Sequence, residues 1–82
     1  MFTTSRYASE KSRNLALKLA KENKELFICR GKRTIASLVE LARKKGEKKI
    51  SIIEEEDGTP KKIAVISVSE LGNWEWSGED EL

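Results

Sequence analysis

The chain has 82 residues, with 16 Lys and Arg against 14 Asp and Glu and a formal net charge of +2, and this length predicts one small domain. It contains no His and one Cys, which excludes a His-activated nucleophile, a structural zinc site and an intramolecular disulfide. No apolar run reaches the length of a membrane span and no signal-peptide pattern is present, so we expect a cytoplasmic protein.

The first half of the chain predicts two strands that alternate with two helices. Residues 2–5 form a short β-branched strand, and residues 9–23 are helix formers. Residues 26–29 are apolar on both faces, which is typical of a buried parallel strand, and Cys29 within them is interpreted as a buried small hydrophobe. A second helix is expected over residues 34–45.

Both helices show a helix cap and an apolar stripe. Ser9 and Thr34 stand at the N-cap positions, where a hydroxyl accepts a hydrogen bond from a free backbone N–H. Apolar residues then recur with helical spacing, so one face of each helix is expected to pack on a sheet. These residues are Leu15, Ala16, Leu19 and Ala20 in the first helix and Ile35, Leu38, Val39 and Ala42 in the second.

The second half predicts a β-hairpin. Strands are expected over residues 49–54 and 63–68, antiparallel around the turn signal in residues 57–60, and residues 71–76 are a further candidate edge strand. The order is therefore β-α-β-α-β-β, an α/β fold with a mixed sheet and two helices. We expect one domain over residues 1–76 and an acidic flexible tail over residues 77–82.

Charge is distributed very unevenly along the chain. Residues 1–50 carry 14 Lys and Arg against 5 Asp and Glu, a net charge of +9, whereas residues 51–82 carry 2 against 9, a net charge of −7. A basic half favours a surface that binds a polyanion, and the alternative is a surface on which the two halves form salt bridges.

Polar and basic residues gather after the first two predicted strands. If these strands are parallel, the residues after each meet at the same carboxyl edge, where two helix N-termini would also point. Cations directly before Thr34 are unfavourable at a helix N-terminus unless an anion is bound, and phosphate is the obvious anion. A P-loop is excluded, because Leu26 and Arg33 stand where that motif needs Gly and Ser or Thr. The predicted phosphate-binding residues are Ser5, Arg6, Arg13, Arg30, Lys32 and Arg33.

An ordered set of short motifs resembles a known family. Thr3-Thr4-Ser5-Arg6, Ser9, Arg13, Arg30-Gly31-Lys32, a Leu-rich helix and Gly58-x-Pro60 follow one another as in the N-terminal half of Brix-domain proteins, in particular the short archaeal members. This resemblance implies a non-catalytic role in ribosome biogenesis and pre-rRNA processing, with rRNA or a pre-ribosomal particle as partner and no cofactor. It also implies half of a two-halved fold related to anticodon-binding domains. The surplus of Lys and Glu is typical of thermophile proteins.

The resemblance predicts a partner for this half-fold, which is either a second copy in a homodimer or another half-domain. Trp74 and Trp76 lie on one face of an extended segment, where they pack on the sheet or help to form that partner interface. The alternative function is a protein–protein assembly subunit that docks through its sheet edge and this Trp segment.

Two further features allow both a structural and a functional interpretation. Tyr7 either stacks on a base or covers the first helix. The acidic run over residues 54–57 could hold a metal, but a solvated hairpin tip paired with Lys61 and Lys62 is favoured, because consecutive strand residues face opposite sides.

Overall fold

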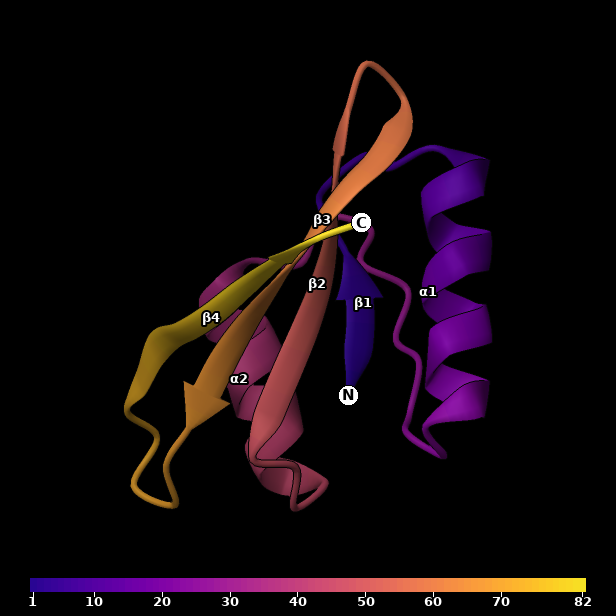
Figure 1. Cartoon of the computed structure of the whole chain (residues 1–82). Helices are drawn as coiled ribbons and strands as arrows, with labels where there is room; N and C mark the ends of the chain where they lie inside the picture. Colours follow the sequence, from indigo (N-terminus) through magenta and orange to yellow (C-terminus); the bar gives the residue numbers. More distant parts are fainter.

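The computed structural model describes residues 1–82 and contains two helices and one four-stranded sheet (Figure 1). The elements in chain order are β1 (Phe2–Thr4), α1 (Glu10–Glu22), α2 (Ile35–Lys44), β2 (Lys49–Glu56), β3 (Thr59–Val68) and β4 (Trp74–Glu81). The sheet order is β1-β2-β3-β4, with β1 parallel to β2 and the other neighbours antiparallel. The predicted α/β class with a mixed sheet and two helices is confirmed.

The second strand expected over residues 26–29 is reduced to a single bridge. Phe27 pairs in parallel with Phe2, whose N–H donates to Leu26 O at 2.8 Å and whose carbonyl accepts from the Ile28 N–H at 2.9 Å. The segment lies outside β1 at the edge of the sheet, so Leu26 and Cys29 are exposed to solvent. The expected burial of Cys29 is therefore wrong. The parallel neighbour of β1 within the sheet is β2, the strand that follows α2.

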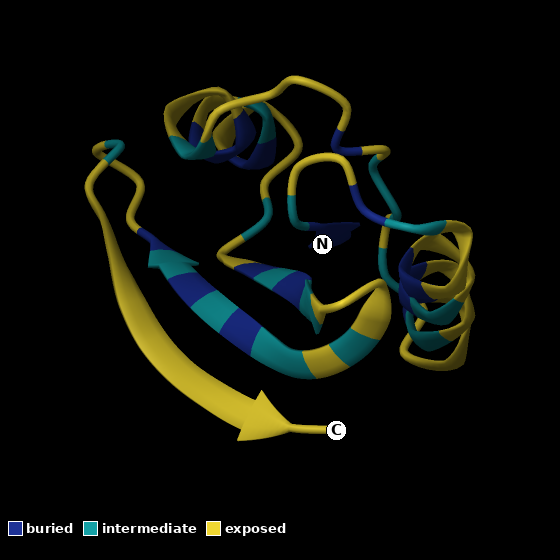
Figure 2. Cartoon of the chain, turned by 90° about the horizontal axis from the view of Figure 1, so that it is seen from above, coloured by how far each residue is buried: buried dark blue, intermediate teal, exposed yellow.

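The two helices cover opposite faces of the sheet (Figure 2). α2 packs on one face of β2 and β3, and all three of its buried residues belong to its predicted apolar stripe. The core on this side is made of Met1, Leu38, Val39, Ala42, Ile50, Ile52, Ile66 and Val68. A continuous apolar cluster of this kind is the main source of stability in so small a fold.

α1 lies over β1 and the adjoining parts of β2 and β3 on the other face. Ala16 and Ala20 are fully buried, whereas the flanking Leu15 and Leu19 are half-buried. Small side chains let the helix approach the sheet closely, and Ile53 of β2 is buried beneath this side. Neither helix combines the length and the apolar character needed to cross a membrane.

The hairpin between β2 and β3 is longer than the sequence indicates. Glu56 pairs with Thr59, so Asp57 and Gly58 alone form the loop, with φ angles of 52° and 77°. Two consecutive positive φ angles define the turn that matches the right-handed twist of a hairpin, and a Gly at the second position is its usual signal. Both strands therefore extend beyond the expected ranges 49–54 and 63–68.

The acidic end of the chain is a strand rather than the expected tail. β4 pairs with β3 from Val68 and Trp74 to Lys62 and Glu81, with a register shift between Val65 and Ile66. The segment forms a strand although its side chains are charged and exposed, because its backbone completes hydrogen bonds with the otherwise open edge of β3. The expected start at residue 71 is also too early, since residues 69–73 form the connecting turn.

Candidate nucleic-acid interface

A hollow of about 510 Å³ lies at the carboxyl end of β1. Two loops and the start of α1 contribute its walls, and no Asp or Glu is among the lining residues. These residues are Thr4, Ser5, Tyr7, Ala8, Arg13, Cys29, Arg30, Gly31 and Lys32. Four of the six predicted phosphate-binding residues therefore line one hollow.

The other two predicted residues lie beside the hollow; Arg6 joins its two loops, and Arg33 closes the turn of the second loop. The Arg6 Nη2 donates a hydrogen bond to Lys32 O at 3.1 Å, and the Arg33 N–H donates to Arg30 O at 3.0 Å. Arg13 is placed by a hydrogen bond from its Nη1 to Ala8 O at 3.0 Å. The structure thus brings together the loops that follow β1 and the 26–29 segment, as the parallel arrangement predicts.

Arg30 differs from the other predicted cations because its side chain is used inside the protein. Arg30 is only 8% exposed, and it donates from Nε to Arg33 O at 2.7 Å and from Nη1 to Thr4 O at 2.9 Å. Burial is the main cause that lowers its pKa, the nearby Arg6 lowers it further, and Glu54 opposes the shift. Arg30 therefore holds the loop against β1 and leaves little of its guanidinium to an external ligand.

The N-terminus of α1 is already occupied by a carboxylate of the protein. The Ser9 N–H donates to both carboxylate oxygens of Glu55, at 3.1 and 3.2 Å, and the hydroxyls of Ser9 and Ser12 donate to its Oε2 at 2.8 and 2.6 Å. The hydrogen bond from Ser12 is the largest of the causes that lower the pKa of Glu55. The sequence-based expectation of two free helix N-termini is therefore wrong for α1.

This arrangement is a capping box whose acid comes from a distant strand. Ser9 caps α1, as predicted, and the residue at the third helical position is Ser12, where a capping box has Glu or Gln. Glu55 of β2 takes that role and accepts from the N-cap N–H. The absence of an acid at position 12 is the signal in the sequence that could have pointed to a carboxylate from elsewhere.

The N-terminus of α2 has no acidic partner. Thr34 caps the helix by accepting a hydrogen bond from the Ser37 N–H at 3.1 Å, as predicted, and the first turn contains no acidic residue. Lys32 and Arg33 stand directly before the cap, and neither forms an ion pair. The positive end of the helix dipole and two cations therefore meet at one place, which favours a bound anion.

The acidic residues of the hairpin do not converge on one point. Glu54 lies 3.7 Å from the Nζ of Lys62, whereas Glu55 faces α1 on the opposite side of β2. Lys62 also lies 3.3 Å from Glu79, whose hydrogen bond and charge are the main causes that raise the pKa of Lys62. The alternation of strand side chains thus separates the two carboxylates, and each has a partner in the fold.

The aromatic residues singled out in the sequence lie at two separate places. Tyr7 is 78% exposed at the rim of the basic hollow, so it does not cover α1. Its φ of 56° is unusual for an aromatic residue, and such outliers gather at functional sites. Trp74 and Trp76 lie on β4, at the other edge of the sheet, with ring centroids 6.1 Å apart in an edge-to-face arrangement.

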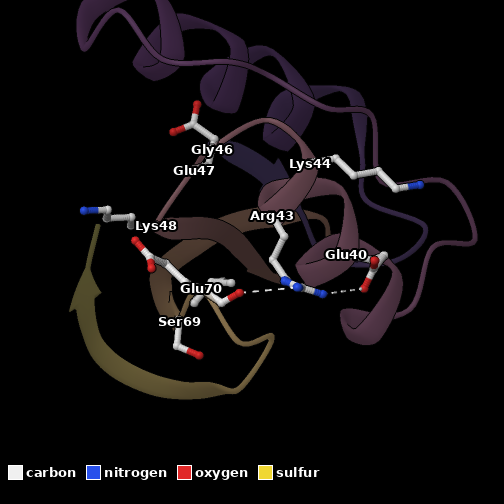
Figure 3. A pocket seen from close by; sticks show the side chains of 9 residues that line it. Glu40, Arg43, Lys44, Gly46, Glu47, Lys48, Ser69 and Glu70 are labelled. Carbon is white, nitrogen blue, oxygen red and sulfur yellow. Dashed lines mark hydrogen bonds and ion pairs between the residues drawn. The ribbon is translucent and has the colours of Figure 1, made fainter.

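A second hollow, of about 450 Å³, lies between the end of α2 and the turn before β4 (Figure 3). Its lining carries three acids, Glu40, Glu47 and Glu70, beside three cations, Arg43, Lys44 and Lys48. Arg43 donates to the Glu40 carboxylate at 3.4 Å and to Glu70 O at 3.3 Å. Because the charges are mixed and partly paired, this hollow lacks the excess of cations that distinguishes the one beside β1.

The fold defines a class of protein, an α/β domain like those of Imp4-like Brix proteins. No family model and no curated protein matches the sequence. Among solved structures, the chain is similar to Mil, an archaeal Imp4-like protein, with a TM-score of 0.73 and 26% identity over 89% of this chain and 45% of that one. It also has the fold of a probable ribosomal biogenesis protein from Aeropyrum pernix K1, with a TM-score of 0.85 and 23% identity over 95% and 44% of the two chains. The resemblance predicted from the sequence is confirmed, and the chain spans somewhat less than half the length of these proteins.

Proposed function

We propose that this protein binds ribosomal RNA during ribosome biogenesis and acts by binding rather than by catalysis. The observation that carries the proposal is a set of four exposed cations, two of which line the basic hollow and two of which lie beside it, and none of which forms an ion pair. They are Arg6, Arg13, Lys32 and Arg33. Unpaired cations around a concave surface are the electrostatic pattern expected of a phosphate-binding site.

The four cations favour a polynucleotide over a single nucleotide. They come from two loops and a helix start, so they are spread around the hollow rather than folded over one phosphate as in a P-loop. The Ser5 hydroxyl and the N-terminus of α2 add hydrogen-bond donors for phosphate oxygens, and Arg30 keeps the second loop in place. Tyr7 adds an exposed ring on which an unpaired base can stack, which is how single-stranded RNA is commonly bound.

The similarity to other proteins supports the biological context of this proposal. One matched structure is described as Imp4-like and another as a probable ribosomal biogenesis protein. We propose that the partner is rRNA or a pre-ribosomal particle in the cytoplasm. A second half-domain, from another chain or a second copy in a homodimer, is part of the same proposal, since both matched proteins extend well beyond the aligned region. Sedimentation velocity against the 9.3 kDa monomer mass tests the homodimer.

A salt titration of RNA binding tests the phosphate site. Binding of a fluorescein-labelled single-stranded RNA is followed by anisotropy between about 50 and 300 mM KCl. Four phosphate contacts predict a slope of log Kobs against log salt of about −3, at roughly −0.7 per phosphate. Lys32→Glu/Arg33→Glu should weaken binding at every salt concentration and bring the slope to about −1.5 or closer to zero.

The matched control is Lys44→Glu/Lys45→Glu, which changes the net charge equally at the far end of α2. This pair is exposed and lies roughly 15 Å along the helix from Thr34, at 1.5 Å per residue. The control should keep most of the affinity and the slope of the unchanged protein. Equal loss in both variants would show that RNA responds to overall charge only, and the proposed site would be refuted.

A further inference from the structure

β4 forms one edge of the sheet, opposite the edge at which the basic hollow lies. All eight of its residues are exposed, and Figure 2 shows the strand in the exposed colour along its whole length. An edge strand presents unpaired backbone N–H and C=O groups, to which an extended chain can add as a further strand.

The register identifies which backbone groups of β4 are open. The Ser69 N–H donates to Asn73 O at 2.8 Å, and the Leu82 N–H donates to Lys61 O at 2.9 Å. Asn73 and Leu82, which flank β4, therefore both turn backbone groups inward, toward β3 and the residues that adjoin it. In an antiparallel pair, the residues of one strand turn their backbone groups alternately inward, toward the partner strand, and outward, away from it. The register shift adds one extra residue to β4 between Trp76 and Gly78. The outward backbone groups therefore belong to Trp74, Trp76, Glu79 and Glu81.

The side chains of these four residues lie on one face of β4. Trp74 and Trp76 stand opposite Val68 and Ile66, which are buried on the α2 side of the sheet. Even so, the two indoles are 40% and 52% exposed, and they contact each other edge to face. β4 has the charged residues and the register shift with which proteins usually protect an open edge, but it also carries two exposed Trp residues, which are typical of interfaces.

Charge selects the kind of chain that this edge accepts. β4 carries four acidic residues and no basic residue, and only one of the acids, Glu79, forms an ion pair. Two copies of β4 side by side would bring like charges together, which is destabilising for cross-strand pairs. A basic chain would instead place Lys or Arg opposite Glu79 and Glu81 and over the indole faces.

We infer that β4 binds an extended basic segment of another protein, which adds to the sheet as a fifth strand. The Trp74–Trp76 pair supplies the apolar contact, the open backbone groups supply the hydrogen bonds, and the acids select a basic partner. This inference does not depend on RNA binding at the hollow, since the two surfaces lie at opposite edges of the sheet.

Trp fluorescence measures this binding directly, because the chain's only two Trp residues lie on β4. The probe is a synthetic ten-residue peptide in which Arg alternates with Val and Thr. We expect a saturable change in Trp emission with 1:1 stoichiometry. Glu79→Lys/Glu81→Lys should weaken binding by about tenfold, because two attractive pairs become repulsive. Far-UV circular dichroism of each variant shows that the fold is retained.

Two controls separate strand addition from general charge attraction. Glu75→Lys/Asp80→Lys makes the same charge change on the opposite face of β4 and should weaken binding only about two- to threefold, as expected of exposed charges at a greater distance. A peptide N-methylated at every peptide nitrogen keeps its charge but has no backbone N–H left to donate from either edge, and it should not bind. Equal binding of the methylated peptide, equal effects of the two variants, or no binding of the basic peptide would each overturn the inference. If Trp emission changes when the protein concentration is raised without peptide, β4 binds a second copy of the chain, and the inference is overturned.

Discussion

Replacement of Arg30 by Met tests whether this arginine holds the loop of the basic hollow in place. Met retains an unbranched stem but removes the hydrogen bonds to Thr4 O and Arg33 O, which are 2.9 and 2.7 Å long. Thr4 is buried, so its carbonyl loses a charged donor without an easy replacement by water. Arg33 is exposed, and water can replace the donor there.

The expected loss of unfolding free energy follows from this difference between the two acceptors. One hydrogen bond from a charged donor to a buried acceptor contributes about 1.5–3 kcal/mol, and relief of the repulsion between Arg6 and Arg30 offsets a small part of the loss. We expect a net loss of roughly 1–2.5 kcal/mol. At a urea m-value of about 1 kcal/mol/M for so small a chain, the midpoint should fall by roughly 1–2.5 M.

Urea unfolding followed by circular dichroism at 222 nm measures this shift. Arg33→Met is the control, because it removes a neighbouring, exposed arginine and should change stability by no more than about 0.5 kcal/mol. A midpoint for Arg30→Met equal to that of the unchanged protein, or to that of the control, would refute the role assigned to Arg30.

Three further changes address the helix ends and the hairpin. Lys32→Glu/Arg33→Glu should raise the free energy of unfolding by a few tenths of a kcal/mol, and with it the melting temperature slightly, because acids before α2 suit its dipole; a lowered melting temperature in calorimetry would contradict this. The lowered pKa of Glu55 means that its contribution to stability is present above the ordinary carboxyl pKa and is lost as the pH falls through the lowered value. Glu55→Gln should therefore destabilise the protein at pH 7 and flatten the acid side of its stability profile, and an unchanged profile would exclude the trans capping box. Gly58→Ala should cost roughly 1 kcal/mol, because φ is 77° there, and chemical denaturation that shows no loss would contradict the proposed turn geometry.

Local sequence patterns predict the helices and the hairpin because the causes are local. The caps Ser9 and Thr34 and the stripe of α2 depend on residues three or four positions apart, and all lie where expected. The turn at Asp57-Gly58 likewise depends on the φ angles of two adjacent residues. These features need no knowledge of the rest of the chain.

The errors concern features that depend on distant neighbours. β4 has an unfavourable composition for a strand, and it forms one because β3 offers an open edge. The 26–29 segment has the composition of a buried strand, but it lies outside β1, so one side of it faces solvent. Burial and pairing of this kind are set by the sheet order, which no local pattern contains.

The same distinction applies to the basic hollow. The sequence predicts which cations follow the first two extended segments, and the structure brings those loops together. It does not show that Arg30 turns inward to Thr4, or that Glu55 reaches Ser9 across 46 positions of sequence. Both contacts join groups that only the folded chain places side by side, so a list of cations overstates the number available to RNA.

The most direct measurement of the central claim uses Cys29, the one cysteine of the chain, which is exposed and lines the basic hollow. Its alkylation rate by N-ethylmaleimide is measured with and without single-stranded RNA at about ten times the Kd, where roughly nine-tenths of the protein is bound. If RNA occupies the hollow, the rate should fall by about tenfold, as mass action requires, and should recover in about 1 M KCl, where phosphate contacts are weakened. An unchanged rate under conditions in which anisotropy shows the RNA to be bound would place the RNA elsewhere and contradict the account.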